Sequence, residues 1–461
     1  MPVRFKPPWR FRLRDVVALC CAAAIAMSAG CAWMPSPGIA RKPDAAIQAV
    51  LDQRAQAVLH HNEKAFLSTL DPTATAFRAA QRQVFDNLAD VPLASWSYRL
   101  QRTGAFPLAP AADSTRQVAT EVAFDYELRG YDTTPVASTA YLTMSQRGGH
   151  WYVASQTDGE PAGRHTAVQL WDQGRVTIVS SAHSLVLGQS DQQVLRPYTE
   201  LADRAVPVVG HAWPGKWPGK AVVEVPGSEA DMAALLGVQP SAYQGIAAVT
   251  TAELHGPRAR HASAPADRII INPQAFAELS PLGRQVVLTH ELTHVATRAD
   301  TTPLTPLWLS EGFADWVGYS ATGLAPPKVA EELAADVRAG RTPRQLPSDA
   351  DFATTSAGLA QAYEGAWLAC RMVAEQWGSG AREQAEWPAD RDISPWRGGR
   401  GRPRSLRAGG EADRVKGSGV LVSLYRAAGR EGTDAALRAA LGIGLDTFTA
   451  RWRAYVTREL R

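Results

Sequence analysis

Hydrophobic positions recur with two different periods along this chain, and the change of period divides it into two parts. Between residues 45 and 70, apolar side chains stand three or four positions apart, which predicts an amphipathic helix. Segments that alternate like strands follow, so residues 45–160 are predicted to form a small α+β domain with a curved sheet. The predicted strands are Ser95–Leu100, Gln117–Leu128, Ala137–Gln146 and His150–Ser155.

The second part, residues 165–461, begins with short apolar runs and ends in segments of helical spacing. This order predicts an α+β fold in which a mixed β-sheet precedes a mostly α-helical domain. The predicted strands are Arg175–Ser180, Ser184–Leu187, Lys220–Val225, Ala247–Glu253 and Arg268–Asn272, and the last predicted helices are Val420–Ala427, Asp434–Leu441 and Leu445–Leu460.

The first 31 residues have the pattern of an export signal. Basic residues precede the apolar run Val16–Ala29, which is too short to span a bilayer comfortably. The run ends in Met27-Ser28-Ala29-Gly30-Cys31, which resembles a bacterial lipobox and implies a lipid anchor at Cys31. Ordinary signal cleavage stays open because Ser28 stands where leucine is usual. We expect an exported protein, either a lipoprotein on the outer face of the cytoplasmic membrane or a secreted one, with a linker over residues 32–44.

Composition narrows the remaining possibilities. Four cysteines occur, but only Cys370 lies beyond Cys31, so the fold is expected to rest on its core rather than on disulfides. The net charge of +3 and the absence of a recurring basic helix give no reason to expect a nucleic-acid partner. Residues 379–417 concentrate Gly, Pro and Arg without periodicity and are predicted to be a disordered insertion. Nothing indicates the oligomeric state.

The segment His290-Glu291-Leu292-Thr293-His294 carries the clearest chemistry. Residues four apart lie on one face of a helix, so His290 and His294 can bind one metal ion, with Glu291 beside a metal-bound water. Ser280-Pro281 is typical of a helix start, and Thr305-Pro306 is expected to open a second helix in the same way. Two histidines with one carboxylate and an open position are typical of a catalytic zinc site.

The third ligand is less certain from the residues alone. Asp300 is one candidate, because some zinc peptidases use an aspartate. Glu311 is favoured, because Asp315 lies one helical turn beyond it and can orient a metal-bound histidine. Apolar residues surround both acids, which argues against a solvated surface helix.

At this point the chain resembles the gluzincin zinc peptidases, in particular the aminopeptidase-N and leukotriene-hydrolase branch. The resemblance rests on the metal motif, on Trp308-Leu309-Ser310-Glu311-Gly312-Phe313-Ala314 and on Tyr363-Glu364-Gly365-Ala366. It implies one zinc ion, a peptide or protein substrate, and an oxyanion-stabilising role for Tyr363, although the spacing of that last motif is one residue shorter here. A core role for Tyr363 stays open.

The resemblance also has a gap. The Gly-x-Met-Glu-Asn segment that anchors the substrate amine in the family's aminopeptidases is absent, so exopeptidase specificity is not implied. The segment Asp267–Asn272 occupies roughly that place. It is expected to be either an edge strand that pairs with an extended peptide or an ordinary structural strand.

By its pattern, the N-terminal part resembles the nuclear-transport-factor-2-like (NTF2-like) cone. That resemblance implies either a ligand-binding module or a spacer. Two hypotheses for the whole chain remain: an exported zinc peptidase that uses Glu291 as general base, and a non-catalytic lipoprotein that keeps the zinc fold as a binding scaffold. Retention of Glu291 favours catalysis.

Overall fold

The computed structural model contains many helices and two β-sheets, which is an α+β fold at the coarse level predicted. No helix among the described residues is long and apolar enough to cross a membrane. The predicted signal peptide and all but the last residue of the predicted insertion lie outside the described part of the chain. The structure describes residues 42–111, 113, 115–240, 245–251, 267–353, 356–378 and 417–461.

Two compact units make up the described chain. The sheet unit contains residues 42–206 and Trp217–Glu278, and the helical unit contains Pro207–Lys216 and the residues from Leu279 onward. The domain boundary predicted near residue 165 therefore falls inside the sheet unit, and the boundary between the units falls inside helix α5 (Gln192–Ala212).

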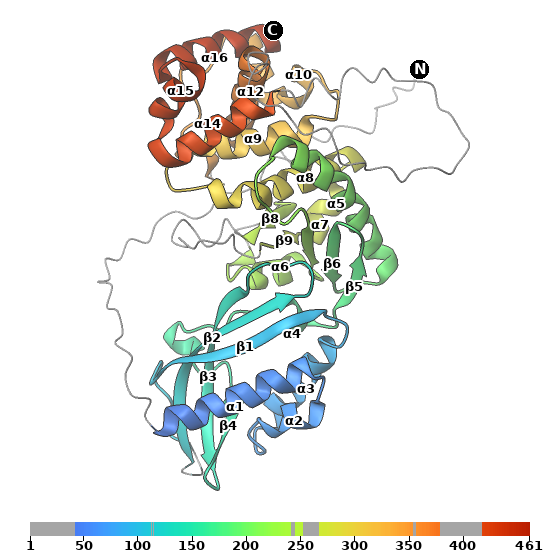
Figure 1. The fold of residues 1–461 in the computed structure, drawn as a ribbon, viewed down its shortest axis with the longest axis vertical. Helices are drawn as coiled ribbons and strands as arrows, with labels where there is room; N and C mark the ends of the chain where they lie inside the picture. Colours follow the sequence, from blue (N-terminus) through green and yellow to red (C-terminus); the bar gives the residue numbers. More distant parts are fainter. Residues whose placement is uncertain are drawn as a thin grey trace, which may run out of the picture. The chain divides into compact units, whose positions relative to one another are not determined.

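The N-terminal half of the sheet unit is an antiparallel four-stranded sheet with a long helix along it (Figure 1). Ile47, Leu51 and Val58 lie on one face of helix α1, and their side chains are buried in the core. Its Gln48 side chain donates to the carbonyl of Tyr98 and accepts from the amide of Leu100, both at 2.8 Å, which ties the helix to β1. The elements are α1 (Lys42–Leu59), α2 (Glu63–Ser68), α3 (Thr75–Asn87), β1 (Leu93–Thr103), β2 (Arg116–Leu128), β3 (Val136–Arg147), β4 (His150–Ser155) and α4 (Leu170–Gln173).

The single helix predicted over residues 45–70 is wrong in one respect, because it breaks after Leu59. His61 adopts a left-handed backbone with φ of 49°, and Asn62 caps the next helix by accepting from the amide of Ala65 at 3.0 Å. Asparagine is a strong N-cap, so a new helix starts there even though the apolar spacing continues.

The second half of the sheet unit is a five-stranded sheet in the order β5-β6-β7-β9-β8. Strands β6, β7 and β9 run parallel, and the outer strands β5 and β8 run antiparallel to their neighbours. The segment Asp267–Asn272 contains β9, which is paired on both sides, so the expectation of an ordinary structural strand is confirmed and the alternative of an edge strand is wrong. The elements are β5 (Thr177–Ser180), β6 (Ser184–Gly188), β7 (Ala221–Val225), α6 (Glu229–Leu235), β8 (Ala248–Thr250), β9 (Ile269–Ile271) and α7 (Pro273–Glu278).

A buried ion cluster joins these two halves within the sheet unit. The guanidinium of Arg268 donates to both carboxylate oxygens of Asp132, at 2.8 and 2.7 Å, and the two side chains are only 3% and 2% exposed. Glu224 lies 3.6 Å from the Nε of Arg268, and the ring of Tyr126 lies 5.6 Å from the guanidinium. The cluster has its own permanent cation, so its buried carboxylates are compensated.

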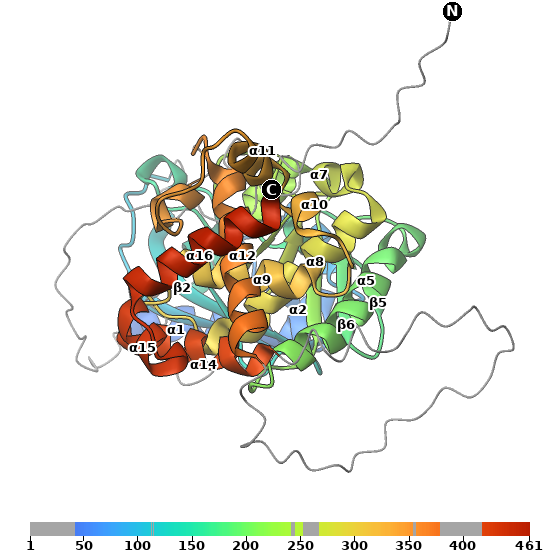
Figure 2. The same cartoon turned by 90° about the horizontal axis from the view of Figure 1, so that it is seen from above.

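The helical unit is built around α9, which packs against α8 and α12, while α14 and α16 pack against α12 (Figure 2). Trp452 on α16 donates its indole N–H to the carbonyl of Gly365 at 3.0 Å, which joins the last helix to α12. The helices are α8 (Pro281–Thr297), α9 (Leu307–Tyr319), α10 (Pro326–Val329), α11 (Glu331–Arg338), α12 (Leu359–Trp377), α14 (Ser418–Glu431), α15 (Thr433–Leu441) and α16 (Leu445–Leu460).

Candidate metal centre

Helix α8 presents the metal motif. The hydroxyl of Ser280 accepts from the amide of Gly283 at 3.0 Å and Pro281 is the first helical residue, so the predicted start is confirmed. His290, Glu291 and His294 are 2%, 0% and 7% exposed. Their burial on an internal helix means that the polar groups must be satisfied by partners inside the protein.

Helix α9 presents the two predicted carboxylates, Glu311 and Asp315, one turn apart. Its start differs from the expectation. Pro306 occupies the N-cap position without a side-chain cap, while the hydroxyl of Thr305 accepts from the amide of Thr302 at 3.1 Å. The helix begins one residue later than the Thr-Pro pattern predicted, and this leaves both acids on the helix.

Two glycines let α9 approach its neighbours closely. A Cβ added at Gly312, the residue after Glu311, would lie 2.4 Å from the carbonyl oxygen of Ala366 on α12. A Cβ added at Gly318 would lie 3.1 Å from the carbonyl oxygen of Val286 on α8. The short distances between α9, α8 and α12 therefore depend on these positions having no side chain.

Three ligand atoms meet where α8 faces α9. The Nε2 atoms of His290 and His294 are 3.0 Å apart, and the Oε2 atom of Glu311 lies 3.4 Å from each. These residues form a buried group that could hold a metal ion. The structure thus brings together the three ligands predicted from the sequence.

Asp315 lies behind the first histidine. Its Oδ1 is 2.8 Å from Nδ1 of His290. An ionised carboxylate only accepts hydrogen bonds, so Nδ1 carries a proton and donates it. Once Nε2 is deprotonated, as metal binding requires, its lone pair would face His294 and Glu311. This contact fixes both the tautomer and the ring orientation that a metal ligand requires.

The chemistry of this group fits a cation. Oε2 of Glu311 is buried and has no hydrogen-bond partner. Burial alone would raise the pKa of Glu311, but His294 and His290 in their protonated, positively charged form lower it to about 2, so the carboxylate is charged. Histidines must be neutral to bind a metal, and a divalent ion between the three atoms would then replace their positive charge beside Glu311.

The other candidate residues lie outside this group. Asp300 accepts from Nε of Arg426 at 3.2 Å and does not belong to the metal-binding group, so Glu311 is the carboxylate that the fold supplies. Tyr363 is buried on α12, where its ring packs edge-on against Phe352 at 5.1 Å.

Glu364, the next residue of the same motif, has a structural contact. Its carboxylate accepts from the amides of Glu332 at 3.2 Å and Leu333 at 2.6 Å, at the start of α11. Burial, followed by the neighbouring Glu332 side chain, raises the pKa of Glu364. The Tyr-Glu pair therefore contributes at least one residue that holds two helices together.

Sequence reasoning did not identify Tyr425 of α14. Its hydroxyl lies 2.8 Å from that of Thr301 and 3.3 Å from that of Ser310, the residue before Glu311. The ring is fully buried against Trp213 and Phe313. Tyr425 thus joins α14 to the segment that follows α8 and to the start of α9, beside Glu311. The apolar spacing predicted a helix over Val420–Ala427 but gave no sign of these partners, more than a hundred residues away.

Comparison with known proteins adds no evidence about this site, so the geometry of His290, His294 and Glu311 is the main evidence for its function. No protein-family model, no curated protein and no solved structure matches the chain.

Proposed function

We propose that this protein is an exported zinc-dependent peptidase that hydrolyses peptide bonds with Glu291 as general base. The observation that carries the proposal is the meeting of His290 Nε2, His294 Nε2 and Glu311 Oε2, with Glu291 buried in the same helix. Two histidines and one glutamate leave a fourth position free for water or substrate, which distinguishes catalytic from structural zinc sites.

The spacing of the three atoms is compatible with zinc, which the set of two histidines and one glutamate favours. Ligands about 2.0–2.2 Å from a tetrahedral zinc ion lie roughly 3.3–3.6 Å from one another. The observed separations of 3.0, 3.4 and 3.4 Å are close to that range. When bound, zinc would lower the pKa of a water molecule and polarise a substrate carbonyl.

The residues of the chain would then handle the proton. Glu291 would accept a proton from the attacking water and return it to the leaving amine, as a general base and then a general acid. Asp315 would keep His290 in the required tautomer. Tyr363 is proposed as the hydrogen-bond donor to the developing oxyanion, on the strength of the family resemblance alone.

The arrangement of elements agrees with the two fold resemblances. A mixed sheet followed by paired metal-bearing helices is what a gluzincin-like catalytic domain requires, and a helix on a curved antiparallel sheet suits an NTF2-like domain. We propose both assignments together with lipid attachment at Cys31. The intact mass of the N-terminal peptide from the membrane fraction tests the attachment, since an unmodified Cys31 would contradict it.

The mechanism is tested by Glu291→Gln, which preserves shape and removes the base. We expect the variant to keep its metal and to lose activity by roughly 10²–10⁴-fold. The measurement is cleavage of a peptide library by wild type, with and without a chelator, and by the variant. Glu278→Gln changes an exposed glutamate on α7 and serves as the matched control, with activity unchanged.

Two outcomes would overturn the proposal. Full activity in the Glu291→Gln variant would contradict the role of Glu291. Stoichiometric zinc without cleavage of any peptide would instead favour the hypothesis of a binding scaffold.

A further inference from the structure

Helix α14 contacts the connection between the two metal-bearing helices. This connection, residues 298–306, leads from α8, which carries both histidines, to α9, which carries the third ligand. On α14, Arg426 donates from Nε to the carboxylate of Asp300 at 3.2 Å. The carbonyl of Gly429, also on α14, accepts from the hydroxyl of Thr302 at 2.6 Å. Helix α14 therefore helps to fix the path of the connection, and with it the placement of α9 relative to α8.

The approach of α14 to the connection is close. A Cβ added at Gly429 would lie 2.8 Å from the carbonyl oxygen of Asp300 and 3.2 Å from Oγ1 of Thr305. The helix can lie at this distance because Gly429 has no side chain. Tyr425 stands one turn earlier on the same face of α14, so its hydroxyl reaches the connection and the start of α9.

The hydroxyl of Tyr425 belongs to a chain of hydrogen bonds whose direction can be assigned. Oγ1 of Thr301 donates to the carbonyl oxygen of Thr297, the last residue of α8, at 3.1 Å. A hydroxyl has a single proton, so the oxygen of Thr301 accepts from the phenol of Tyr425 at 2.8 Å. The phenol oxygen can in turn accept from Oγ of Ser310 at 3.3 Å. The chain thus runs from α9 through Tyr425 to the end of α8.

The surroundings keep the phenol in the form that this chain requires. Burial raises the pKa of Tyr425, and the negative charge of Glu311 acts in the same direction. Hydrogen bonds with three neighbouring hydroxyls lower the pKa by less, so that it stays above its usual value. The phenol is therefore neutral and keeps the proton that it donates to Thr301.

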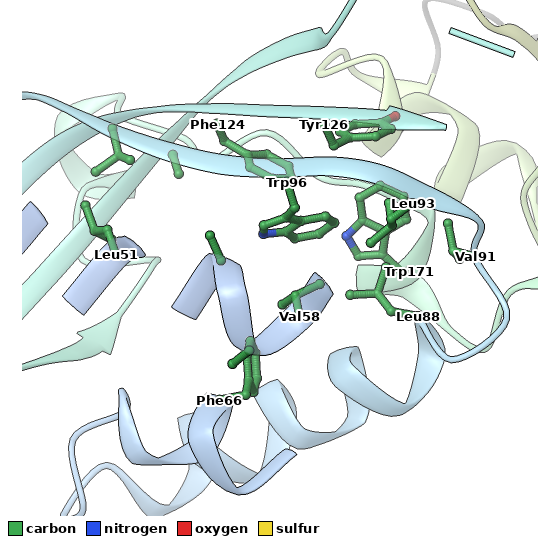
Figure 3. Close-up of a cluster of buried hydrophobic side chains, with 14 of the residues drawn as sticks. Leu51, Val58, Phe66, Leu88, Val91, Leu93, Trp96, Phe124, Tyr126 and Trp171 are labelled. Carbon is green, nitrogen blue, oxygen red and sulfur yellow. The ribbon is translucent and has the colours of Figure 1, made fainter. Parts of the chain in front are cut away.

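Buried tyrosines elsewhere in the chain use their hydroxyls differently. Tyr126 lies beside Phe124 in the core of the sheet unit (Figure 3), and its hydroxyl contacts the arginine of the buried ion cluster. Tyr455 of α16 donates to the carboxylate of Glu375 at 2.7 Å. Both of these hydroxyls have a charged partner. Tyr425 instead contacts other hydroxyls, and these lie on the segments that lead from the histidines to the third ligand.

We propose that Tyr425 is a positioning residue of the metal site: it holds the start of α9, and with it Glu311, where the carboxylate meets the two histidines. Ligands that are in place before the ion arrives need no ordering on binding, so pre-organisation raises the affinity. Loss of the hydroxyl would keep all three ligands but loosen the helix that carries one of them. This inference rests on the metal site of the proposed function, and it does not require peptide hydrolysis.

The test is the zinc affinity of the full chain, measured by competition with a fluorescent zinc chelator. Tyr425→Phe removes only the hydroxyl, and we expect zinc affinity to fall by about fivefold or more, the effect of one lost hydrogen bond. Tyr455→Phe is the matched control, because it removes another buried hydroxyl and its hydrogen bond within the same unit. Both variants should be less stable in urea, but Tyr455→Phe should keep the zinc affinity of wild type.

A double-variant cycle tests the route of the effect. Thr301→Val removes the acceptor of the phenol and keeps the shape of the side chain, and it should weaken zinc by about threefold or more. Combined with Tyr425→Phe, it should weaken zinc little further, because both changes break the same hydrogen bond. Circular dichroism verifies folding, and if Tyr425→Phe does not fold, Thr301→Val decides.

The outcomes separate this inference from the function on which it rests. Wild-type zinc affinity in folded Tyr425→Phe, or an equal loss in Tyr455→Phe, would overturn the inference and leave the zinc site in place. Effects of Tyr425→Phe and Thr301→Val that simply add would overturn the hydroxyl chain as its basis. A wild-type chain that binds no zinc would instead overturn the proposed function, and this inference with it.

Discussion

Two buried clusters of charged side chains, one in each unit, differ in a single respect. In the sheet unit, Arg268 supplies a permanent positive charge to Asp132 and Glu224. In the helical unit, the ion-pair partners of Glu311 and Asp315 among the described residues are histidines, whose charge depends on protonation. Burial and pairing are similar in both, so neither property by itself marks a functional site. The second cluster lacks a permanent cation, and its three converging atoms could hold a metal ion in that place.

The largest loss of stability is expected when the cluster in the sheet unit loses its arginine. Arg268→Met would leave two buried carboxylates without a cation, and we expect the free energy of unfolding to fall by about 3–5 kcal/mol. Urea unfolding monitored by fluorescence measures this loss. Metal content should be unchanged in the folded variant. A loss below about 1 kcal/mol would mean that the cluster is solvated in solution and that the comparison fails.

In the cluster of the helical unit, we expect a substitution to change the affinity for the metal. Asp315→Asn keeps the size of the side chain but weakens the hold on the His290 tautomer, so metal affinity should fall by about 10–100-fold. Competition with a fluorescent zinc chelator measures the affinity. Asp446→Asn, at an exposed position in the first turn of α16, is a comparison with a carboxylate outside the site and should leave metal affinity unchanged. Equal affinity in Asp315→Asn and wild type would remove Asp315 from the site.

A third buried group, Glu364 beside Glu332, has neither an arginine nor a histidine among its hydrogen-bond partners described here. Its pKa is raised from 4.5 to about 9, first by burial. The folded state therefore binds more protons than the unfolded state between about pH 4.5 and 9, so this group makes stability fall as pH rises through that window.

Glu364→Gln should remove this contribution, which is at most about 1.4 kcal/mol per pH unit. Urea unfolding at pH 5 and pH 8 should show a smaller decrease with pH for the variant than for wild type. The exposed Glu331→Gln, at the start of α11, is the control and should keep the wild-type slope. Identical slopes for Glu364→Gln and wild type would show that the pKa of Glu364 is not raised in the folded protein.

The sequence predicted those parts of the site that follow from residue spacing within one helix. Spacing on one helix placed His290, Glu291 and His294 together, and the same argument placed Asp315 one turn beyond Glu311. It could not predict that Arg268 meets Asp132, or that Tyr425 meets Ser310, because nothing in either pattern encodes a partner more than a hundred positions away. The sequence left open whether Asp267–Asn272 is an edge strand or an ordinary structural strand for the same reason: a run of isoleucines indicates burial, but not which strands lie on either side.

The most direct test of the central claim is the zinc content of purified protein, measured by mass spectrometry of the metal. The account predicts one zinc ion per chain in wild type, one in Glu291→Gln, and a loss of bound zinc in Glu311→Gln, where the carboxylate ligand is replaced by an amide of the same size. Wild-type protein that takes up no stoichiometric zinc, or a Glu311→Gln variant that keeps its zinc with wild-type affinity, would contradict the account.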